Sequence, residues 1–220
     1  MSNAIRWTWV WSLAVAGCTG EFQFQSGPKV PPAEPPGDDV DEQGDPPDWQ
    51  NCPQGWRGIY TNLKNSDEFV APRANEDPAP TDPSKLPFWD QSSFEQFDPT
   101  LDFGQSWWPV NEGLEDDPKY FAVYWHAWIR AWSNTTLSFL LGAQDDVWVY
   151  VNGDPIAEQP GIHDTFERTK YDIYLDAGQY PIEVWYAHRG SEISAMSFRV
   201  VSGDVSVCYP TFGEDTPTAP

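Results

Sequence analysis

The most constraining feature of the chain is the segment KYFAVYWHAWIRAW at residues 119–132, whose two alternate sets of side chains differ in character. One set mixes aromatic residues with a histidine and an arginine, and the other is apolar throughout. The apolar set consists of Phe121, Val123, Trp125, Ala127 and Ile129. A period of two places alternate side chains on opposite faces of a β-strand, whereas an amphipathic helix needs a period near 3.6. The segment is therefore predicted to be a strand whose apolar face lies in a core.

Further strand-like segments follow at short intervals, separated by residues that favour turns. They are TTLSFLLGA (135–143), DDVWVYV (145–151), the pair within TKYDIYLDAGQYPIEVWY (169–186) and AMSFRVVSG (195–203). Leu137, Phe139 and Leu141 share one side of their strand, and Asn152-Gly153 is a strong tight-turn signal. This spacing without helical periodicity predicts an all-β fold, either an antiparallel β-sandwich or a barrel.

The net charge of the chain limits the kinds of molecule that it can bind. The chain has 12 basic and 34 acidic residues among its 220, which gives a formal net charge of −22. So acidic a protein repels phosphate backbones, and nucleic acid is therefore not expected as a partner. The charge suits cations, basic partners or solubility outside the cell.

The first 17 residues have the layout of a secretory signal peptide, with Arg6 ahead of the short apolar run WTWVWSLAVAG. That run is too short for a stable membrane helix. Because LAVAGC resembles a bacterial lipoprotein signal, we expect cleavage before Cys18 and lipidation of that cysteine. Thr19, rather than an aspartate, follows it, which in lipoproteins favours the outer membrane or the cell surface. The alternative is ordinary cleavage after Ala16, with Cys18 unmodified.

The amino-acid composition divides the rest of the chain into a linker, a folded head and a tail. Residues 18–50 are rich in Pro, Gly, Asp and Glu and poor in large apolar residues, so we expect a disordered, extended linker there. Residues 51–210 would form the folded head, including a proline-rich irregular insertion at 71–100. Residues 211–220 would form a disordered tail.

The three cysteines are an odd number for an exported protein. If Cys18 is lipidated, Cys52 and Cys208 remain, one near each end of the head. In an oxidising compartment these two could pair and join the two ends of one domain. The alternative is two unrelated thiols.

Six segments of the head occur in an order that characterises a known family. They are GWRGIYTNL (55–63), LDFGQSW (101–107), FAVYWHAWI (121–129), LSFLLGAQDDVWVYVNG (137–153), YLDAGQYPIEVWY (174–186) and YAHRGSEISAMSFRV (186–200). In this order the chain resembles the PA14 domain, a β-sandwich of bacterial toxins, glycosidases and yeast adhesins, and still more the related fibro-slime domain. The resemblance covers most of residues 52–203 and implies a PA14-like antiparallel β-sandwich.

The resemblance also implies a metal site. In carbohydrate-binding PA14 domains, two adjacent aspartates joined by a cis peptide hold a Ca²⁺ ion, which coordinates sugar hydroxyls. Ca²⁺ takes six to eight oxygen ligands, which paired carboxylates and backbone carbonyls can supply. Counted back from Asn152-Gly153, the aspartate pair falls on Gln144 and Asp145. Asp145 and Asp146 form the pair instead if the loop is one residue shorter.

The departure at Gln144 leaves two interpretations of this acidic loop. Gln144 offers a neutral oxygen, so with Asp145 and Asp146 it would make a weaker Ca²⁺ site than two paired aspartates. In the other interpretation the two aspartates only cap a turn ahead of a strand. The resemblance also implies a second ligand-binding loop, which would carry His188, Arg189, Ser191 and Glu192; ordinary surface loops have the same composition.

No residue pattern points to catalysis. The chain has no G-x-S-x-G motif, P-loop or dinucleotide-binding fingerprint, and pairs of carboxylates are uninformative among 34 acidic residues. His126, His163 and His188 lie on separate segments without the spacing of zinc ligands. We therefore expect no enzyme activity.

Aromatic residues could either fill the core or stack on sugar rings. The candidates are Trp56, Trp107, Trp108, Trp125, Trp128, Trp132, Trp148 and Trp185. Together these features predict a non-catalytic surface recognition module that binds carbohydrate or mediates adhesion, with Ca²⁺ as its expected cofactor and a glycan as its partner. Its only membrane contact would be the lipid anchor. The alternative is a structural or protein–protein interaction module of the cell envelope or extracellular matrix.

Overall fold

The computed structural model describes residues 29–30, 49, 52–62, 83, 93–109, 119–162, 165–189 and 192–209. The predicted signal peptide, Cys18, His163, Ser191 and the tail after residue 210 lie outside these ranges. Among the residues that the structure does describe, no helix is long and apolar enough to cross a bilayer.

The described chain is built from strands, numbered in chain order. Their bounds are β1 (Lys29–Val30), β2 (Trp56–Asn62), β3 (Ser93–Asp98), β4 (Leu101–Gln105), β5 (Tyr120–Ala131), β6 (Thr135–Gln144), β7 (Asp146–Val151), β8 (Asp154–Gln159), β9 (Thr169–Leu175), β10 (Gly178–Arg189), β11 (Ala195–Ser202) and β12 (Val205–Cys208).

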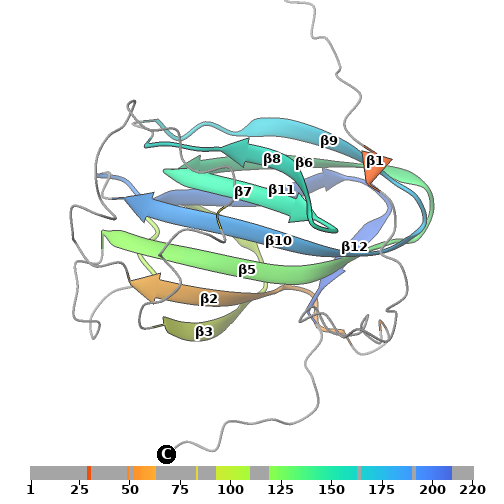
Figure 1. Ribbon diagram of the computed structural model, residues 1–220, viewed down its shortest axis with the longest axis horizontal. Helices are drawn as coiled ribbons and strands as arrows, with labels where there is room; N and C mark the ends of the chain where they lie inside the picture. Colours follow the sequence, from red (N-terminus) through yellow and green to blue (C-terminus); the bar gives the residue numbers. More distant parts are fainter. Residues whose placement is uncertain are drawn as a thin grey trace, which may run out of the picture.

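The strands form two sheets that lie face to face as a β-sandwich (Figure 1). One sheet has the strand order β3-β2-β5-β10-β7-β8, with β12 also paired to β5, and the other has the order β1-β9-β6-β11-β4. All pairings are antiparallel except the two-residue pairing of β1 with β9. The predicted all-β, antiparallel sandwich is thus the observed architecture.

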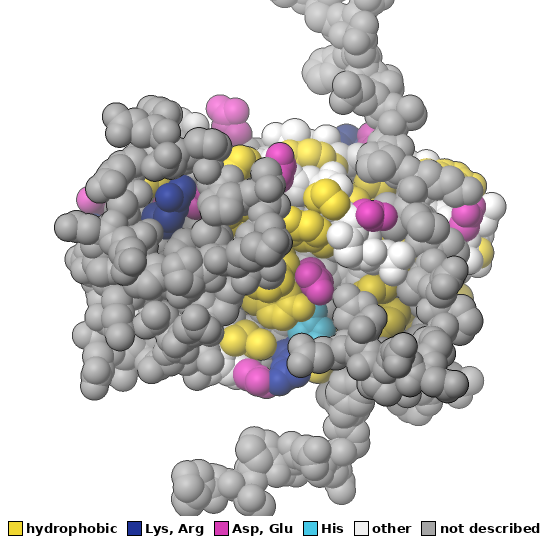
Figure 2. All heavy atoms as spheres, viewed as in Figure 1, with side chains coloured by type: hydrophobic (Ala, Val, Ile, Leu, Met, Phe, Trp, Pro, Cys, Tyr) yellow, Lys and Arg dark blue, Asp and Glu magenta, His cyan; other side chains and the backbone are white. Residues whose placement is uncertain are grey.

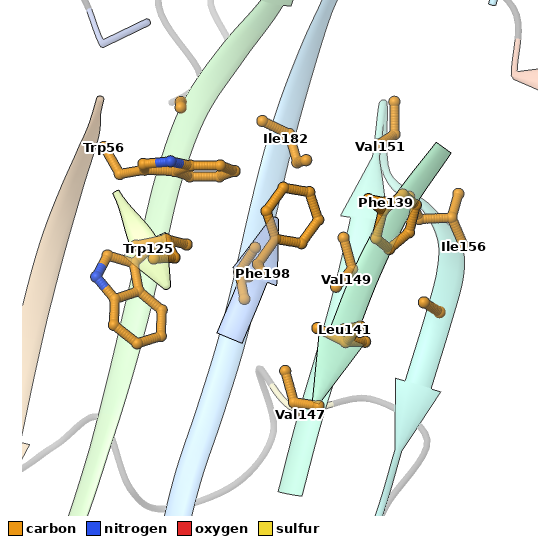
Figure 3. Packing of buried hydrophobic residues seen from close by; sticks show 14 of the residues in the cluster. Trp56, Trp125, Phe139, Leu141, Val147, Val149, Val151, Ile156, Ile182 and Phe198 are labelled. Carbon is orange, nitrogen blue, oxygen red and sulfur yellow. The ribbon is translucent and has the colours of Figure 1, made fainter. Parts of the chain in front are cut away.

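The two sheets enclose one hydrophobic core, and the alternation in β5 explains how. The five residues of its predicted core face are 0–1 % exposed, and Leu137, Phe139 and Leu141 of β6 are fully buried. Figure 3 shows Trp56, Trp125 and Ile182 of one sheet meeting Phe198 and Leu141 of the other. Burying each such side chain contributes about 1.5–3 kcal/mol relative to exposure, so this layer is the main support of the sandwich.

The side chains on the opposite face of β5 differ in their exposure to solvent. Trp132 is 52 % exposed and lies 3.8 Å from the guanidinium carbon of Arg130, whereas Trp128 on the same face is buried. The guanidinium of Arg130 also lies 5.8 Å from the ring centroid of Trp49. Trp49 and β1 both belong to the segment expected to be a linker, so the described parts of that segment contact the head.

A strand also occupies the end of the segment expected to be irregular. β3 pairs along β2 from Trp56↔Asp98 to Thr61↔Ser93 and forms the edge of its sheet. The prediction was wrong for these six residues because SFEQFD does not alternate cleanly. Phe94 stacks on the core residue Tyr60, whereas Phe97 lines a surface hollow.

Cys52 and Cys208 form a disulfide, as the cysteine count suggested, and close a loop of 156 residues in sequence separation. Cys208 lies in β12 opposite Trp128 of β5, and the residues next to the bridge add backbone contacts. Tyr209 N donates to Pro53 O at 3.0 Å, and Gly55 N donates to Val207 O at 3.4 Å. The bridge therefore joins the start and the end of the described head.

Candidate functional site

The candidate site lies at one end of the sandwich, where two of the chain's crossings between the sheets meet. β6 ends at Gln144 in the five-stranded sheet, and β7 begins at Asp146 in the other sheet. β10 ends at Arg189, and β11 returns to the five-stranded sheet at Ala195. The two crossings lie side by side because Ala187 pairs with Asp146 and Ala195 pairs with Gln144.

The first crossing, Gln144–Asp146, is buried although all three residues are polar. Their exposed fractions are 2 %, 0 % and 1 %. The peptide bond between Gln144 and Asp145 is cis, at the position where the resemblance to PA14 domains places such a bond. Tyr186, fully buried on β10, donates its hydroxyl hydrogen to the carbonyl oxygen of Gln144.

Arg189 joins the two crossings. Its Nε donates to Oδ2 of Asp146 at 2.6 Å, and its Nη2 donates to Oδ1 of the same carboxylate at 3.1 Å. Its backbone N donates to Oδ2 of Asp145 at 2.7 Å, across 44 residues of sequence. The structure therefore brings together the acidic pair and the second loop, as one ligand-binding site would require.

The carboxylate of Asp146 has a third donor, the backbone N of Gly161, at 2.5 Å from Oδ1. Burial raises the pKa of Asp146 because desolvation penalises the charged form, and Arg189 and Gly161 oppose that effect. Sequence reasoning missed Gly161, since its contribution is a backbone group and no side-chain pattern marks it.

His188 lies beneath the surface of the site. It is fully buried, with its ring 5.4 Å from that of Phe121 and 5.2 Å from that of Trp108 between centroids. Nδ1 lies 2.5 Å from the carbonyl oxygen of Lys119 and Nε2 lies 3.2 Å from that of Ile193. The ring thus holds the second crossing against β5 and plays a structural part in the site.

The exposed rim of the site is formed by other residues. Ile193 is 40 % exposed, and Trp108, half-buried, contacts the edge of the His188 ring. Glu192 is exposed and pairs with Lys119 at 3.4 Å, a surface ion pair that contributes little to stability. Of the predicted second loop, Arg189 and Glu192 therefore remain accessible in part, and Ser191 is outside the described residues.

The carboxylates as arranged do not match a calcium site. At least three of their four oxygens accept hydrogen bonds from described N–H groups, and a guanidinium lies against Asp146. A Ca²⁺ ion at the same carboxylates would lie next to a charge of like sign. Among the residues that the structure describes, no three or more His, Cys, Asp or Glu side chains are grouped to hold a metal ion.

A second concave feature lies away from this site. Hydrophobic side chains gather on the outer face of the seven-stranded sheet, with charged residues and a histidine among them (Figure 2). Here a hollow of about 350 Å³ is lined by Pro53, Arg57, Glu95, Gln96, Phe97 and Tyr209. Arg57 opposes His126 on β5, six positions from the β5 residue that pairs with Arg189. The hollow is therefore separate from the crossings.

The hollow is close to charge-neutral. Arg57 forms an ion pair with Glu95 and donates from Nη1 to the hydroxyl of Tyr209 at 3.2 Å. Behind it, burial and then the nearby charge of Arg57 lower the pKa of His126 to about 4, so the imidazole is neutral at pH 7. Its ring packs edge-on against Tyr209 at 4.8 Å between centroids.

Comparison with models of known protein families and with curated protein sequences gives no match. Solved structures match at low identity. The A domain of epithelial adhesin 9 from Candida glabrata, in complex with Galβ1-3GlcNAc, is 13 % identical, with coverage of 86 % of this chain and 89 % of that chain and a TM-score of 0.44.

Two further solved structures match over different shares of their length. The PA14 sugar-binding domain from an RTX adhesin is 15 % identical, covering 67 % of this chain and 88 % of that chain, with a TM-score of 0.48. The GH31 α-xylosidase from Xanthomonas citri is 12 % identical, covering 54 % of this chain, with a TM-score of 0.42. The present chain spans only 14 % of that enzyme.

Proposed function

We propose that this protein is a non-catalytic recognition module that binds carbohydrate at the end of the sandwich where Gln144–Asp146 meets Arg189. The single observation that carries the proposal is the convergence of these two crossings, 44 residues apart in sequence, on one buried ion pair. Rigid polar groups held by strands rather than by free loops are what a specific binding site requires.

The geometry of Arg189 leaves part of its guanidinium for a ligand. Asp146 holds the group side-on through Nε and Nη2, and no described residue accepts a hydrogen bond from Nη1. The side chain as a whole is 14 % exposed, and a ligand that approaches through Nη1 would leave the ion pair intact. A hydroxyl or carboxylate oxygen of a sugar would be a suitable acceptor.

The rim offers the apolar contact that a sugar ring also needs. Trp108 is half-buried beside His188, and Ile193 is exposed. Sugar rings carry C–H-rich faces that pack on aromatic side chains, while their hydroxyls bond to polar groups. Arg189, Glu192 and the two apolar residues together supply both kinds of contact.

The protein would work outside the cytoplasm. The disulfide between Cys52 and Cys208 supports an oxidising compartment, because such bonds are rare where thiols are kept reduced. We propose that Cys18 carries the lipid anchor and that residues 18–50 connect it to the head at the bacterial outer membrane or cell surface. Mass spectrometry of the mature N-terminus would test this, with a Cys18→Ser variant as the unlipidated control.

A second candidate function is a purely structural or protein-contact module of the envelope or extracellular matrix. It is favoured by the full burial of Asp145, Asp146 and His188, since a network that only holds two loops together would be buried in the same way. In that case the polar end of the sandwich contributes stability and specificity of fold but binds no sugar.

A glycan array followed by saturation-transfer NMR separates the two candidates. We expect the folded protein to retain at least one glycan and leave it unhydrolysed, and Trp108→Ala to weaken that binding at least tenfold. Phe97→Ala, an aromatic truncation in the separate hollow, is the matched control and should leave binding unchanged. Thermal melts of both variants confirm that they fold. A blank array with folded protein would support the structural module.

A further inference from the structure

Asp145 and Asp146 pose an electrostatic problem. They are adjacent in sequence, 0 % and 1 % exposed, and of like charge. Carboxylates withdrawn from water are strongly unfavourable unless they are paired and hydrogen-bonded. Burial also acts on this pair directly, because it raises the pKa of Asp146, with a smaller contribution in the same direction from the charge of Asp145. The corner between the sheets therefore needs a cation.

The structure supplies that cation from its own chain. The guanidinium of Arg189 meets both oxygens of Asp146 in a two-point contact, the geometry in which arginine and carboxylate bind most strongly. The arginine side chain is 14 % exposed and the carboxylate 1 %, so little water screens the pair. The backbone N of the same residue serves Asp145.

The position of Arg189 is fixed by the sheets and not by a free loop. It is the last residue of β10 and pairs with Tyr120 of β5, two positions after Ala187, which pairs with Asp146. The strand register therefore places Arg189 beside the acidic corner. The guanidinium compensates the charge of Asp146, and the carboxylate of Asp145 accepts a hydrogen bond from the backbone N of the same arginine.

We propose that Arg189 is the resident cation of this corner and replaces the Ca²⁺ ion that the acidic pair otherwise suggests, so that the fold of the corner is independent of metal. This inference concerns the folded state alone and holds whether or not the protein binds carbohydrate. The proposal predicts that the melting temperature does not depend on Ca²⁺ while Arg189 is present, and does depend on Ca²⁺ when this side chain is removed.

The test is a set of thermal melts of the full chain with Ca²⁺ alone, with EDTA and with Mg²⁺. For the wild-type protein we expect the same melting temperature in all three. Arg189→Met removes the charge and keeps much of the side-chain volume, so it should lower the melting temperature in EDTA. Added Ca²⁺ should then raise that temperature more than Mg²⁺ does, because binding to the folded state alone is stabilising.

Two further variants keep the test decisive. Arg189→Lys retains a positive charge and should stay insensitive to Ca²⁺, although it loses the two-point contact. Asp146→Asn combined with Arg189→Met removes both partners, and should be more stable in EDTA than Arg189→Met and less responsive to Ca²⁺. If Arg189→Met does not fold without metal, folding of this variant on addition of Ca²⁺ supports the inference.

Three results would overturn it. The first is a rise in the wild-type melting temperature with Ca²⁺, or calorimetric binding of Ca²⁺ to the wild-type protein. The second is an Arg189→Met variant as stable as the wild type. The third is an Arg189→Met variant that is destabilised or unfolded and to which Ca²⁺ restores nothing. None of these readouts uses a glycan, so failure here is distinguishable from failure of the carbohydrate proposal.

Discussion

The indole of Trp125 donates a buried hydrogen bond from Nε1 to Oδ2 of Asp98, at 2.8 Å. The same oxygen accepts the hydroxyl hydrogen of Tyr60 at 2.6 Å, and Oδ1 accepts from Nε2 of Gln96 at 2.8 Å. Asp98 is 2 % exposed and is the last residue of the edge strand β3. One carboxylate thus ties an edge strand to the aromatic core.

Replacing Asp98 should destabilise the fold strongly. Asp98→Ala leaves the buried N–H of Trp125 and the buried hydroxyl of Tyr60 without their acceptor, and we expect a loss of about 2–4 kcal/mol in the free energy of unfolding. Asp98→Asn keeps one acceptor oxygen and should lose less. Urea unfolding curves measure both, with Asp154→Ala on the exposed start of β8 as a control that changes little. Equal stability of Asp98→Ala and Asp154→Ala would contradict this role.

Gly58 on β2 should tolerate no side chain. A Cβ there would lie 2.7 Å from Cε2 of Tyr60 and 2.8 Å from both Oδ2 of Asp98 and Nε1 of Trp125. Gly58→Ala therefore has to displace the hydrogen-bonded group, and we expect a loss of at least about 2 kcal/mol in unfolding free energy.

The comparison for this variant is Gly153→Ala in the β7–β8 turn. Gly153 has φ +79° and no heavy atom within 4 Å of a built Cβ, so only backbone strain of about 1 kcal/mol opposes alanine. Chemical denaturation should rank Gly58→Ala below Gly153→Ala in stability. The reverse order would show that the aromatic cluster relaxes around the methyl group.

Removing the disulfide should destabilise the protein, because the unfolded chain then has more conformational entropy. Cys52→Ser with Cys208→Ser frees a loop of 156 residues, which in the chain-entropy model destabilises the folded protein by up to about 5 kcal/mol. Cys18→Ser, outside the described residues, is the control and should melt like the wild type. Melts with and without reductant check this: reductant should lower the wild-type melting temperature and leave the double variant unchanged.

His126 should make stability depend on pH. Its pKa is lowered from 6.5 to about 4, chiefly by burial, so between these values the unfolded chain binds a proton that the folded protein does not. Stability is therefore fully present above pH 6.5 and is lost as the pH falls towards 4, by up to about 3 kcal/mol from this group.

His126→Phe isolates that contribution. The ring is retained for packing against Tyr124 and Tyr209, but the proton site is gone. Unfolding free energies measured from pH 7 to pH 4 should fall less steeply for the variant than for the wild type. Parallel slopes for the two proteins would show that the imidazole is protonated equally in both states.

Local pattern was enough to predict the strands that carry the core. In β5 and β6 every second residue from Phe121 to Ile129 and from Leu137 to Leu141 is apolar, and all of these residues are buried. The turn at Asn152-Gly153 was equally visible, because both residues adopt positive φ angles that this pair accommodates.

β3 was not predictable, since its position depends on partners far away in sequence. Phe94 stacks on the core, whereas Phe97 lines the surface hollow. The strand is held in place by the hydrogen bonds that Asp98 accepts from Tyr60 and Trp125. Among 34 acidic residues nothing local marks Asp98 as buried. A hydrogen bond across 27 residues carries no periodic signature.

The acidic pair and Arg189 were both singled out from the sequence, the first as a metal site and the second as part of a further ligand-binding loop. The contact between them was not predicted. Which groups meet is decided by the register of β10 on β7, and a register cannot be read from either segment alone. The ion pair between Arg189 and Asp146 follows from that register.

The placement of the disulfide has a mechanical consequence. Cys208 lies opposite Trp128 of β5, whereas Arg189 lies opposite Tyr120 at the other end of the same strand. Tension between the bridge and the end of the sandwich that carries Arg189 would run parallel to β5 and load its backbone hydrogen bonds to β10 in shear, all at once. Strands loaded in this direction share the force among all of their hydrogen bonds instead of unzipping one bond at a time, and the covalent bridge keeps the two ends of the described head from separating first.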